Sequence, residues 1–385
     1  MKIVGIITEY NPFHNGHLYQ LRRAKELSGA DYAVAVMSGS FVQRGEPAIC
    51  DKWARAKMAV SCGVDLVVEL PVVYSVQSAE FFAMGAVKIL NAINTDYISF
   101  GVEDDNLQRL TDTAYLLCNE PPEFKSMLCN GLKCGDSFPA AREAAARSFG
   151  AADVLLTPNN ILGVEYIKAL IKTSSKMKPV PIKRIGSQHD CFGSASHIRS
   201  ISPENAKEFM PPDAYEIFLK EIENGKAPVN IKSIEAAVIS KLRLISSAQL
   251  ARISGVSEGL ENRIKQAAAE KTSVEDIVDF VKTKRYTHSR IRRIMINALL
   301  DITKEEITKP PQYIRVLGLG KGGREVLRGI KNDASLPIIT KTSSAKKADM
   351  LCFDMAATDI YSLMYPDKRL RIGNLDFFTS PIVCL

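Results

Sequence analysis

The stretch near the start of this 385-residue chain reads Ile3-Val4-Gly5-Ile6-Ile7-Thr8-Glu9-Tyr10-Asn11-Pro12-Phe13-His14-Asn15-Gly16-His17-Leu18. Its apolar run predicts a first β-strand, Pro12 marks a turn, and His14 and His17 stand where a helix begins. Residues three apart share a helical face, so both imidazoles can face one ligand. Gly16 lets a phosphate approach the backbone at a helix N-terminus. The stretch therefore predicts a polyphosphate site; the alternative is that the histidines only satisfy local hydrogen bonds.

The first 200 residues alternate short apolar runs with segments of helical pattern. The β-rich runs are 3–7, 32–37, 66–69, 97–100 and 180–185, and the candidate helices are 17–28, 51–62, 78–92, one after Pro139, 161–172 and a short one containing 196–199. Strands separated by helices predict βαβ units, a Rossmann-like α/β fold with a parallel sheet. Such sheets bind ligands beyond the carboxyl ends of their strands.

Proline pairs and a change of periodicity predict three parts. Residues 1–202 are expected to form a Rossmann-like domain that carries the polyphosphate site, 203–308 a helical and basic module, and 309–385 a small α/β segment. Within the last segment, 314–317 and 336–340 are expected strands around a helix at 322–331. Residues 318–323 formally match GxGxxG, but no acidic residue follows about twenty positions later, so a tight turn is favoured over a second nucleotide site.

Composition excludes several classes of protein. No apolar run is long enough to span a membrane, and the N-terminus lacks a signal-peptide pattern. The eight cysteines form no CxxC pair and no Cys/His zinc spacing, and no third ligand accompanies the two histidines, so no metal site is predicted in the protein. We expect a cytoplasmic protein. The formal net charge of +7 is compatible with an RNA partner.

The His14-x-Gly16-His17 turn resembles the nucleotidyltransferase superfamily related to class I aminoacyl-tRNA synthetases, and Ser194-Ala195-Ser196-His197-Ile198-Arg199 resembles its second motif in altered form. Longer strings resemble the bacterial tRNA(Met) cytidine acetate ligase family. They are the residues 9–17, 37–48, 65–71, 77–80 and 285–293. The resemblance spans most of the chain and implies that residues 1–202 are the ATP-binding catalytic domain and residues 203–308 a tRNA-binding module.

The resemblance implies a ligase that activates acetate with ATP as acetyl-adenylate. The acetyl group then passes to N4 of the wobble cytidine of elongator tRNA(Met), without acetyl-coenzyme A. Expected partners are therefore ATP, acetate and tRNA(Met), with Mg²⁺ accompanying ATP and no DNA. The alternatives are a small-molecule nucleotide adenylyltransferase and a non-catalytic tRNA- or ribosome-binding protein. His14, His17 and Arg199 are the implied catalytic residues, because attack on the α-phosphate requires neutralisation of phosphoryl charge.

The resemblance also implies the ATP-binding residues. They are Ile7, Thr8, Glu9, Tyr10, Asn11, Pro12, Phe13, His14, Asn15, Gly16, His17, Leu18, Tyr19, Gln20, Gly101, Asn160, Arg184, Ile185, Ser194 and Ser196. Three of these have alternatives. Gly101 can be a plain turn, Asn160 can cap the helix that starts at 161, and Arg184 can be a solvated charge.

Basic residues in two regions are candidates for tRNA contact. They are Arg44, Lys52, Arg55, Lys284, Arg285, Arg290, Arg292 and Arg293. Residues 282–293 contain six Lys or Arg and no acid, so one helix face could bind a phosphate backbone. The alternative for this run, and for Lys52 and Arg55, is a solvated basic face.

Overall fold

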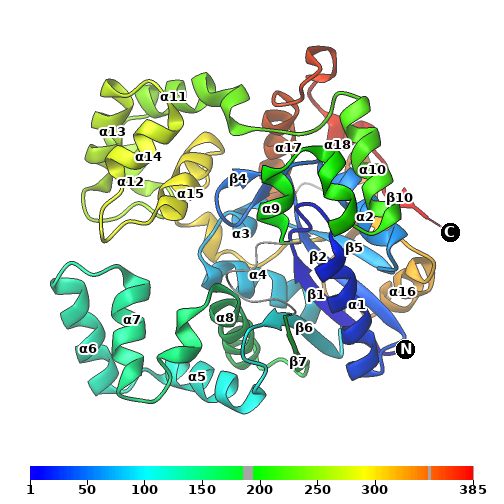
Figure 1. Ribbon diagram of the computed structural model, residues 1–385, viewed down its shortest axis with the longest axis horizontal. Helices are drawn as coiled ribbons and strands as arrows, with labels where there is room; N and C mark the ends of the chain where they lie inside the picture. The colour runs from blue at the N-terminus through cyan, green and yellow to red at the C-terminus, as the bar shows by residue number, and fades with distance from the viewer. Residues whose placement is uncertain (185–193, 346–347, 385) are drawn as a thin grey trace.

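The computed structural model describes residues 1–184, 194–345 and 348–384. Within them, eight strands form the main sheet and two form a separate hairpin (Figure 1). The main strands are β1 (Ile3–Thr8), β2 (Tyr32–Ser38), β5 (Leu66–Leu70), β6 (Tyr97–Val102), β7 (Lys178–Lys183), β8 (Ile314–Leu319), β9 (Ile338–Ile339) and β10 (Ile382–Val383), and the hairpin is β3 (Phe41–Val42) and β4 (Glu46–Pro47). The order is β10-β8-β5-β2-β1-β6-β7, with β9 beside β8.

Strand β1 lies between β2 and β6 and is parallel to both, with Ile3 opposite Tyr32 and Val4 opposite Tyr97. All six residues of β1 are buried, as expected for a parallel strand covered on both faces. Alternate side chains enter two separate cores: Ile3 and Ile7 pack on one face, and Val4 and Ile6 on the other. The predicted Rossmann-like α/β sheet is confirmed.

Helices cover both faces of this sheet. On the face of Val4 and Ile6 lie α1 (Asn15–Ser28), α2 (Lys52–Ser61) and α10 (Pro212–Glu223). On the face of Ile3 and Ile7 lie α3 (Val72–Ser75), α4 (Ala79–Ala92), α8 (Pro158–Lys172), α16 (Gly323–Ile330) and α17 (Asp349–Ser362). Because α1 follows β1 directly, the His14–His17 turn lies at the carboxyl end of β1, an interior strand of the sheet.

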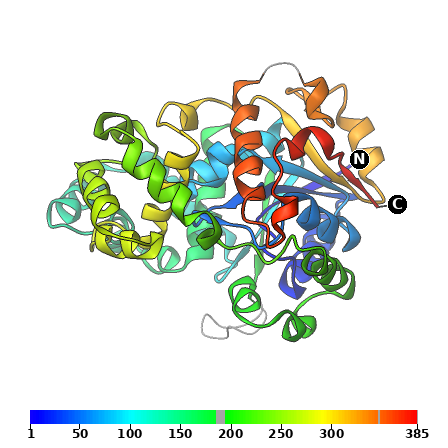
Figure 2. The same ribbon diagram turned by 90° about the horizontal axis from the view of Figure 1, so that it is seen from above.

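Two groups of helices extend beyond the sheet on the same side of the molecule (Figures 1 and 2). The first follows β6 and consists of α5 (Leu107–Asn119), α6 (Pro122–Lys133) and α7 (Phe138–Arg147). The second consists of α11 (Glu235–Leu244), α12 (Ser247–Arg252), α13 (Leu260–Glu270), α14 (Val274–Val281) and α15 (His288–Leu299). A Lys284–Asp136 ion pair at 2.8 Å joins the two groups.

The remaining helical pieces are short. They are α9 (Ala195–Ser200), α18 (Leu375–Phe378) and the 3₁₀ turns η1 (Asp153–Leu156), η2 (Pro203–Phe209), η3 (Ile231–Ile234), η4 (Glu306–Thr308), η5 (Thr342–Ser344) and η6 (Lys368–Leu370). No helix among the described residues has the length and apolar character needed to cross a bilayer.

The C-terminal segment completes the main sheet. Strand β8 pairs antiparallel with β5, and β10 pairs with β8. Gly320 and Gly323 of the GxGxxG match pack against the turn before β5, where a Cβ atom would lie 2.3 Å from the carbonyl oxygens of Val64 and Asp65. These glycines therefore permit close packing of the chain, which supports the structural interpretation of that motif.

Candidate active site

The turn between β1 and α1 is closed by the two histidines. His14 is the N-cap residue of α1, and its Nδ1 accepts a hydrogen bond from the Gly16 amide at 3.0 Å. In return, the His14 amide donates to Nδ1 of His17 at 3.3 Å. The two rings lie with their centroids 3.8 Å apart. A capping box made of two imidazoles thus sets the start of the helix.

These bonds fix where each imidazole can donate. Nδ1 of both rings accepts a backbone N–H, so in a neutral ring the proton lies on Nε2. Burial, with the nearby positive charges of Arg184 and Arg199, lowers the pKa of His14 to about 3. Burial also lowers the pKa of His17 well below its ordinary value. The turn therefore carries two neutral Nε2–H donors at the N-terminus of α1, where the helix dipole also favours negative charge.

A cavity of about 190 Å³ opens beside this turn, at the carboxyl ends of β1 and β6. Nine predicted ATP-binding residues line it: Ile7, Thr8, Glu9, Tyr10, Asn11, His17, Gln20, Gly101 and Arg184. Seven other lining residues were not predicted: Gln43, Phe82, Phe100, Asn159, Leu162, Tyr166 and Ala195. Most of these seven residues lie in α4, α8 and β6. They belong to no recognisable sequence motif, so the sequence does not mark them as site residues. Residues 43–46 come after β2 at the same sheet edge as His14, so the sequence places Gln43 near the turn, although it does not mark it as an ATP contact.

Two arginines bring positive charge to the turn. Arg199, in α9, donates from Nη1 to the Asn11 carbonyl at 2.8 Å and from Nη2 to Ser196 Oγ at 3.4 Å. Arg184 follows β7 and packs near Gly101, at the end of the neighbouring strand. The positive charges of both guanidinium groups lower the pKa of His14, so both lie near it. The fold therefore brings Arg184 and the segment 196–199 to the start of α1, as the resemblance implies.

Asn160 of α8 positions the loop that follows β6, beside the cavity. Its Oδ1 accepts the amides of Glu103 and Asp104 at 2.9 and 3.2 Å, which holds the loop after β6. The interpretation of Asn160 as a helix cap is wrong, because α8 begins at Pro158 with Thr157 as its N-cap. Its contact with ATP stays a prediction.

Several other predicted ATP-binding residues lie near the turn but do not line the cavity. Pro12 and Phe13 are buried under the turn, Asn15 donates from Nδ2 to the Glu208 carbonyl at 2.9 Å, and Ser194 caps α9. Leu18 and Tyr19 lie in the first turns of α1, partly buried. Ile185 lies outside the described residues.

Glu9 is the acidic group of the cavity. It follows β1, and its Oε1 accepts the Gln43 amide at 2.9 Å, which ties the cavity to the β3–β4 hairpin. Burial raises the pKa of Glu9, although Arg199, Arg44 and Arg55 oppose the shift.

The structure corrects two predicted tRNA contacts. Arg55 is fully buried and donates to the carbonyl oxygens of Cys50, Glu9, Ser38 and Gly39. Lys52 is 1% exposed and lies in an ion pair with Glu69 at 2.9 Å. Neither side chain reaches a surface where RNA could bind, so both act inside the fold; the solvated-face alternative is wrong as well.

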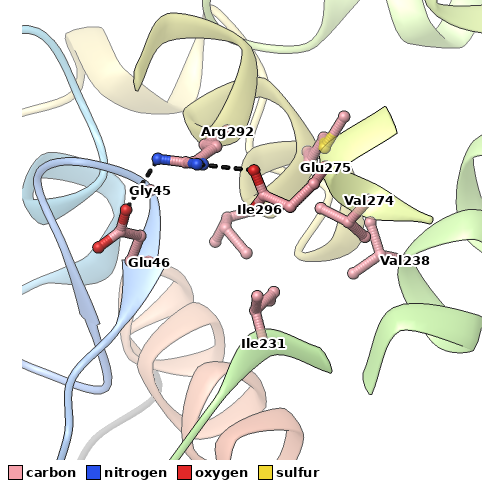
Figure 3. A pocket seen from close by; sticks show the side chains of 9 residues that line it. Gly45, Glu46, Ile231, Val238, Val274, Glu275, Arg292 and Ile296 are labelled. Atoms are coloured by element: carbon pink, nitrogen blue, oxygen red, sulfur yellow. Dashed lines mark hydrogen bonds and ion pairs between the residues drawn. The ribbon is translucent and has the colours of Figure 1, made fainter. Parts of the chain in front are cut away.

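The basic run 282–293 is largely paired within the protein. Lys284 pairs with Asp136, Arg285 with Glu258, and Arg290 donates to the Gly255 carbonyl and Ser257. Arg292 bridges Glu46 of the hairpin at 3.0 Å and Glu275 of α14 at 2.7 Å, at the edge of a small apolar cavity of about 80 Å³ (Figure 3). Arg293 donates to the Gln43 carbonyl at 3.4 Å. Arg292 and Arg293 thus hold helix α15 against the hairpin. Contact of the basic run with tRNA stays a prediction.

Substitution of Gly45 by alanine is expected to separate the hairpin from α15. Gly45 has φ +77°, and a Cβ atom there would lie 2.4 Å from the Arg293 amide nitrogen. The left-handed backbone alone costs a non-glycine residue on the order of 1–3 kcal/mol, and this contact adds to it. Denaturant unfolding should show a larger loss in the free energy of unfolding for Gly45→Ala than for Gly259→Ala. Gly259 has the same φ as Gly45, but a Cβ atom there would meet no other atom within 4 Å. Equal losses would contradict close packing at Gly45.

Among the described residues, no group of three His, Cys, Asp or Glu could hold a metal ion.

The chain is similar to known proteins over its full length. A family model described as HIGH Nucleotidyl Transferase matches residues 1–375. The tRNA(Met) cytidine acetate ligase of Thermoanaerobacter sp. (strain X514) is 46% identical, and that of Acetivibrio thermocellus 41% identical, each covering 100% of both chains. A crystal structure of Thermotoga maritima TmcAL bound with alpha-thio ATP has a TM-score of 0.93 at 40% identity, also over 100% of both chains.

Proposed function

Because this chain belongs to the tRNA(Met) cytidine acetate ligases, within the HIGH nucleotidyltransferase family, we propose that it joins acetate to a cytidine of tRNA(Met) with ATP. Acetate attacks the α-phosphate of ATP, pyrophosphate leaves, and N4 of the wobble cytidine of the elongator tRNA then attacks the acetyl-adenylate. A cytosine amine and a free carboxylate do not combine unaided, so activation must come first.

The observation that carries this proposal is the pair of Nε2–H donors at the N-terminus of α1. Charge builds on the phosphoryl oxygens during displacement, and fixed N–H donors stabilise it without reorganisation. Arg184 and Arg199 add positive charge close to His14. Together these groups hold a triphosphate for in-line attack, with no covalent enzyme intermediate.

Mg²⁺ is proposed as part of the Mg–ATP substrate. It is usually bound by one or two carboxylates together with substrate phosphates, and it keeps several waters. No group of three His, Cys, Asp or Glu among the described residues could form a protein cage for the ion.

We propose that tRNA approaches over the hairpin and the helical module 203–308, in the cytoplasm. Arg44 is exposed at the tip of the hairpin, close enough to Glu9 and Arg199 to influence their pKa values. A phosphate bound there would bring the anticodon loop to the cavity, where a splayed base can enter.

Replacing Arg44 by alanine is expected to weaken tRNA binding and to reduce the slope of log K against log salt by about one, because one phosphate contact is lost. Binding measured across a salt series tests this. Arg44→Lys keeps the charge and should retain the slope. An unchanged slope in Arg44→Ala would remove Arg44 from the RNA surface.

Mass spectrometry of tRNA after incubation with labelled acetate and ATP tests the function itself. One acetyl group on the wobble cytidine of elongator tRNA(Met) is expected. Adenylylation of a small nucleotide without acetylated RNA would favour a small-molecule adenylyltransferase. Binding of RNA without any ATP turnover would favour a non-catalytic protein.

A further inference from the structure

Transfer of the acetyl group to a cytosine amine requires a group that takes a proton. The amine nitrogen gains a positive charge when its lone pair forms the bond to the acetyl carbon. A base that removes the proton at that moment prevents the amine from leaving again. The groups available to do this are the titratable side chains that face the cavity.

The two histidines are unsuited to that task. In each ring Nδ1 already accepts a backbone N–H, and Nε2 carries the hydrogen. Neither neutral imidazole has a lone pair left to accept a proton from the amine. Their geometry suits donation to phosphate.

The other titratable groups at the cavity are also excluded. Tyr10 and Tyr166 are both buried, and burial raises the pKa of each phenol further above neutrality. Arg184 is a cation with no acceptor atom. Among the described residues that line the cavity, Glu9 is the one carboxylate.

The carboxylate of Glu9 is held in place from one side. Its Oε1 accepts the Gln43 amide, and no described residue donates a hydrogen bond to its Oε2. Glu9 is half-buried and lines the cavity, so its carboxylate borders the space that a ligand would fill. A carboxylate oxygen is also the natural acceptor for the N4 amino group of cytosine.

We propose that Glu9 is the general base of the acetyl transfer and that it orients the N4 amine of the incoming cytidine. This inference rests on the function proposed above. N4 forms the N–C bond to the acetyl carbonyl carbon, and the C–O bond to AMP breaks with its electron pair going to the phosphate oxygen. The N4 proton moves to Oε2 of Glu9 and is later released to water.

Burial favours this role, because it raises the pKa of Glu9 toward the working pH, where a base is most effective. The charged groups that face Glu9 are Arg44 from the hairpin, Arg55 from α2 and Arg199 from α9, and all three favour the ionised form. Tyr166 of α8 is the neutral titratable group nearby. Since the base acts when deprotonated, the transfer rate should rise with pH through the pKa of Glu9 and then level off.

The test separates the two half-reactions of the full-length enzyme. Acetate-dependent exchange of pyrophosphate into ATP reports adenylate formation. Single-turnover transfer from preformed enzyme-bound acetyl-adenylate to tRNA(Met), measured across pH, reports the second step. Glu9→Gln keeps the size of the side chain and an oxygen to accept the Gln43 amide, but it removes the base.

In Glu9→Gln the transfer rate is expected to fall at least about 100-fold, the lower end for a general base. Its rise with pH should disappear, and pyrophosphate exchange should fall much less. Glu9→Asp should restore part of the rate together with the pH dependence. Glu26→Gln, at an exposed carboxylate near the other end of α1, should behave as wild type. ATP binding by each variant, measured by calorimetry, verifies that it is folded.

Two outcomes would overturn the inference. A Glu9→Gln enzyme that keeps the wild-type pH profile in the transfer step would show that the phosphate of the adenylate, or water, takes the proton. An equal loss in both half-reactions would place Glu9 in adenylate formation instead. If the wild-type enzyme forms no acetyl-adenylate at all, the proposed function itself fails, which is a separate result.

Discussion

Replacing His14 or His17 by alanine is expected to abolish adenylate formation while tRNA affinity is largely retained. Each change removes one Nε2–H donor from the place where negative charge develops on the phosphoryl group. The loss of such a donor raises the barrier by about 3–4 kcal/mol, or roughly 10²–10³ in rate. Pyrophosphate exchange measures this step without RNA. Tight binding of tRNA by both variants would show that the RNA surface is intact.

The capping role of His14 requires a matched control. Its Nδ1 caps helix α1, so His14→Ala also removes a cap worth about 1 kcal/mol of stability. Asparagine is a good N-cap residue, and His14→Asn should restore the stability but not the exchange activity. His288→Ala, which removes a surface ion pair with Asp279, should leave exchange unchanged. Exchange at the wild-type rate in His14→Ala would refute the role of the imidazole.

Replacing Lys52 by methionine is expected to destabilise the whole protein. Lys52 of α2 and Arg315 of β8 lie between Glu69 of β5 and Asp376 of α18, and all four side chains are at most 4% exposed. Two positive and two negative charges balance there, with Lys52 Nζ 2.9 Å from both carboxylates. Removal of one cation leaves a buried negative charge without a partner, which costs about 3–5 kcal/mol.

Chemical denaturation monitored by circular dichroism measures the loss in the free energy of unfolding of Lys52→Met. Lys57→Met makes the same substitution at an exposed position of the same helix and should change the free energy of unfolding little. Because Glu69 and Arg315 join β5 to β8, the C-terminal segment should become protease-sensitive first in Lys52→Met. Equal stability of the two variants would mean that this cluster does not hold the segment in place.

The sheet and the His14–His17 turn could be predicted from the sequence, because hydrophobic periodicity and the proline and glycine residues that mark turns are local signals. The strand at 3–7 and the helix at 17–28 appear as β1 and α1 with small changes at their ends. Helix α5 was missed although Leu110, Ala114 and Leu117 give a helical spacing that could have revealed it. The pairing of β8 with β5 could not be predicted from the sequence. The two strands are more than two hundred residues apart, and no local sequence pattern indicates which strands pair over that distance.

Interpretation of the basic residues was less successful for a physical reason. A lysine or arginine looks the same in sequence whether it faces RNA or a buried carboxylate. The partners of Lys52 and Arg292 come from distant strands and hairpins, namely Glu69 and Glu46, and only the fold brings them together. Glu9 was included in the nucleotide segment, but its position as the sole carboxylate among the described cavity residues required the structure.

The central claim is that paired imidazoles at the start of α1 hold the triphosphate. A crystal structure of this protein with a non-hydrolysable ATP analogue tests it most directly. Phosphate oxygens should lie within about 2.7–3.2 Å of Nε2 of both His14 and His17. Phosphates bound elsewhere, with both Nε2 atoms facing only water, would contradict the account.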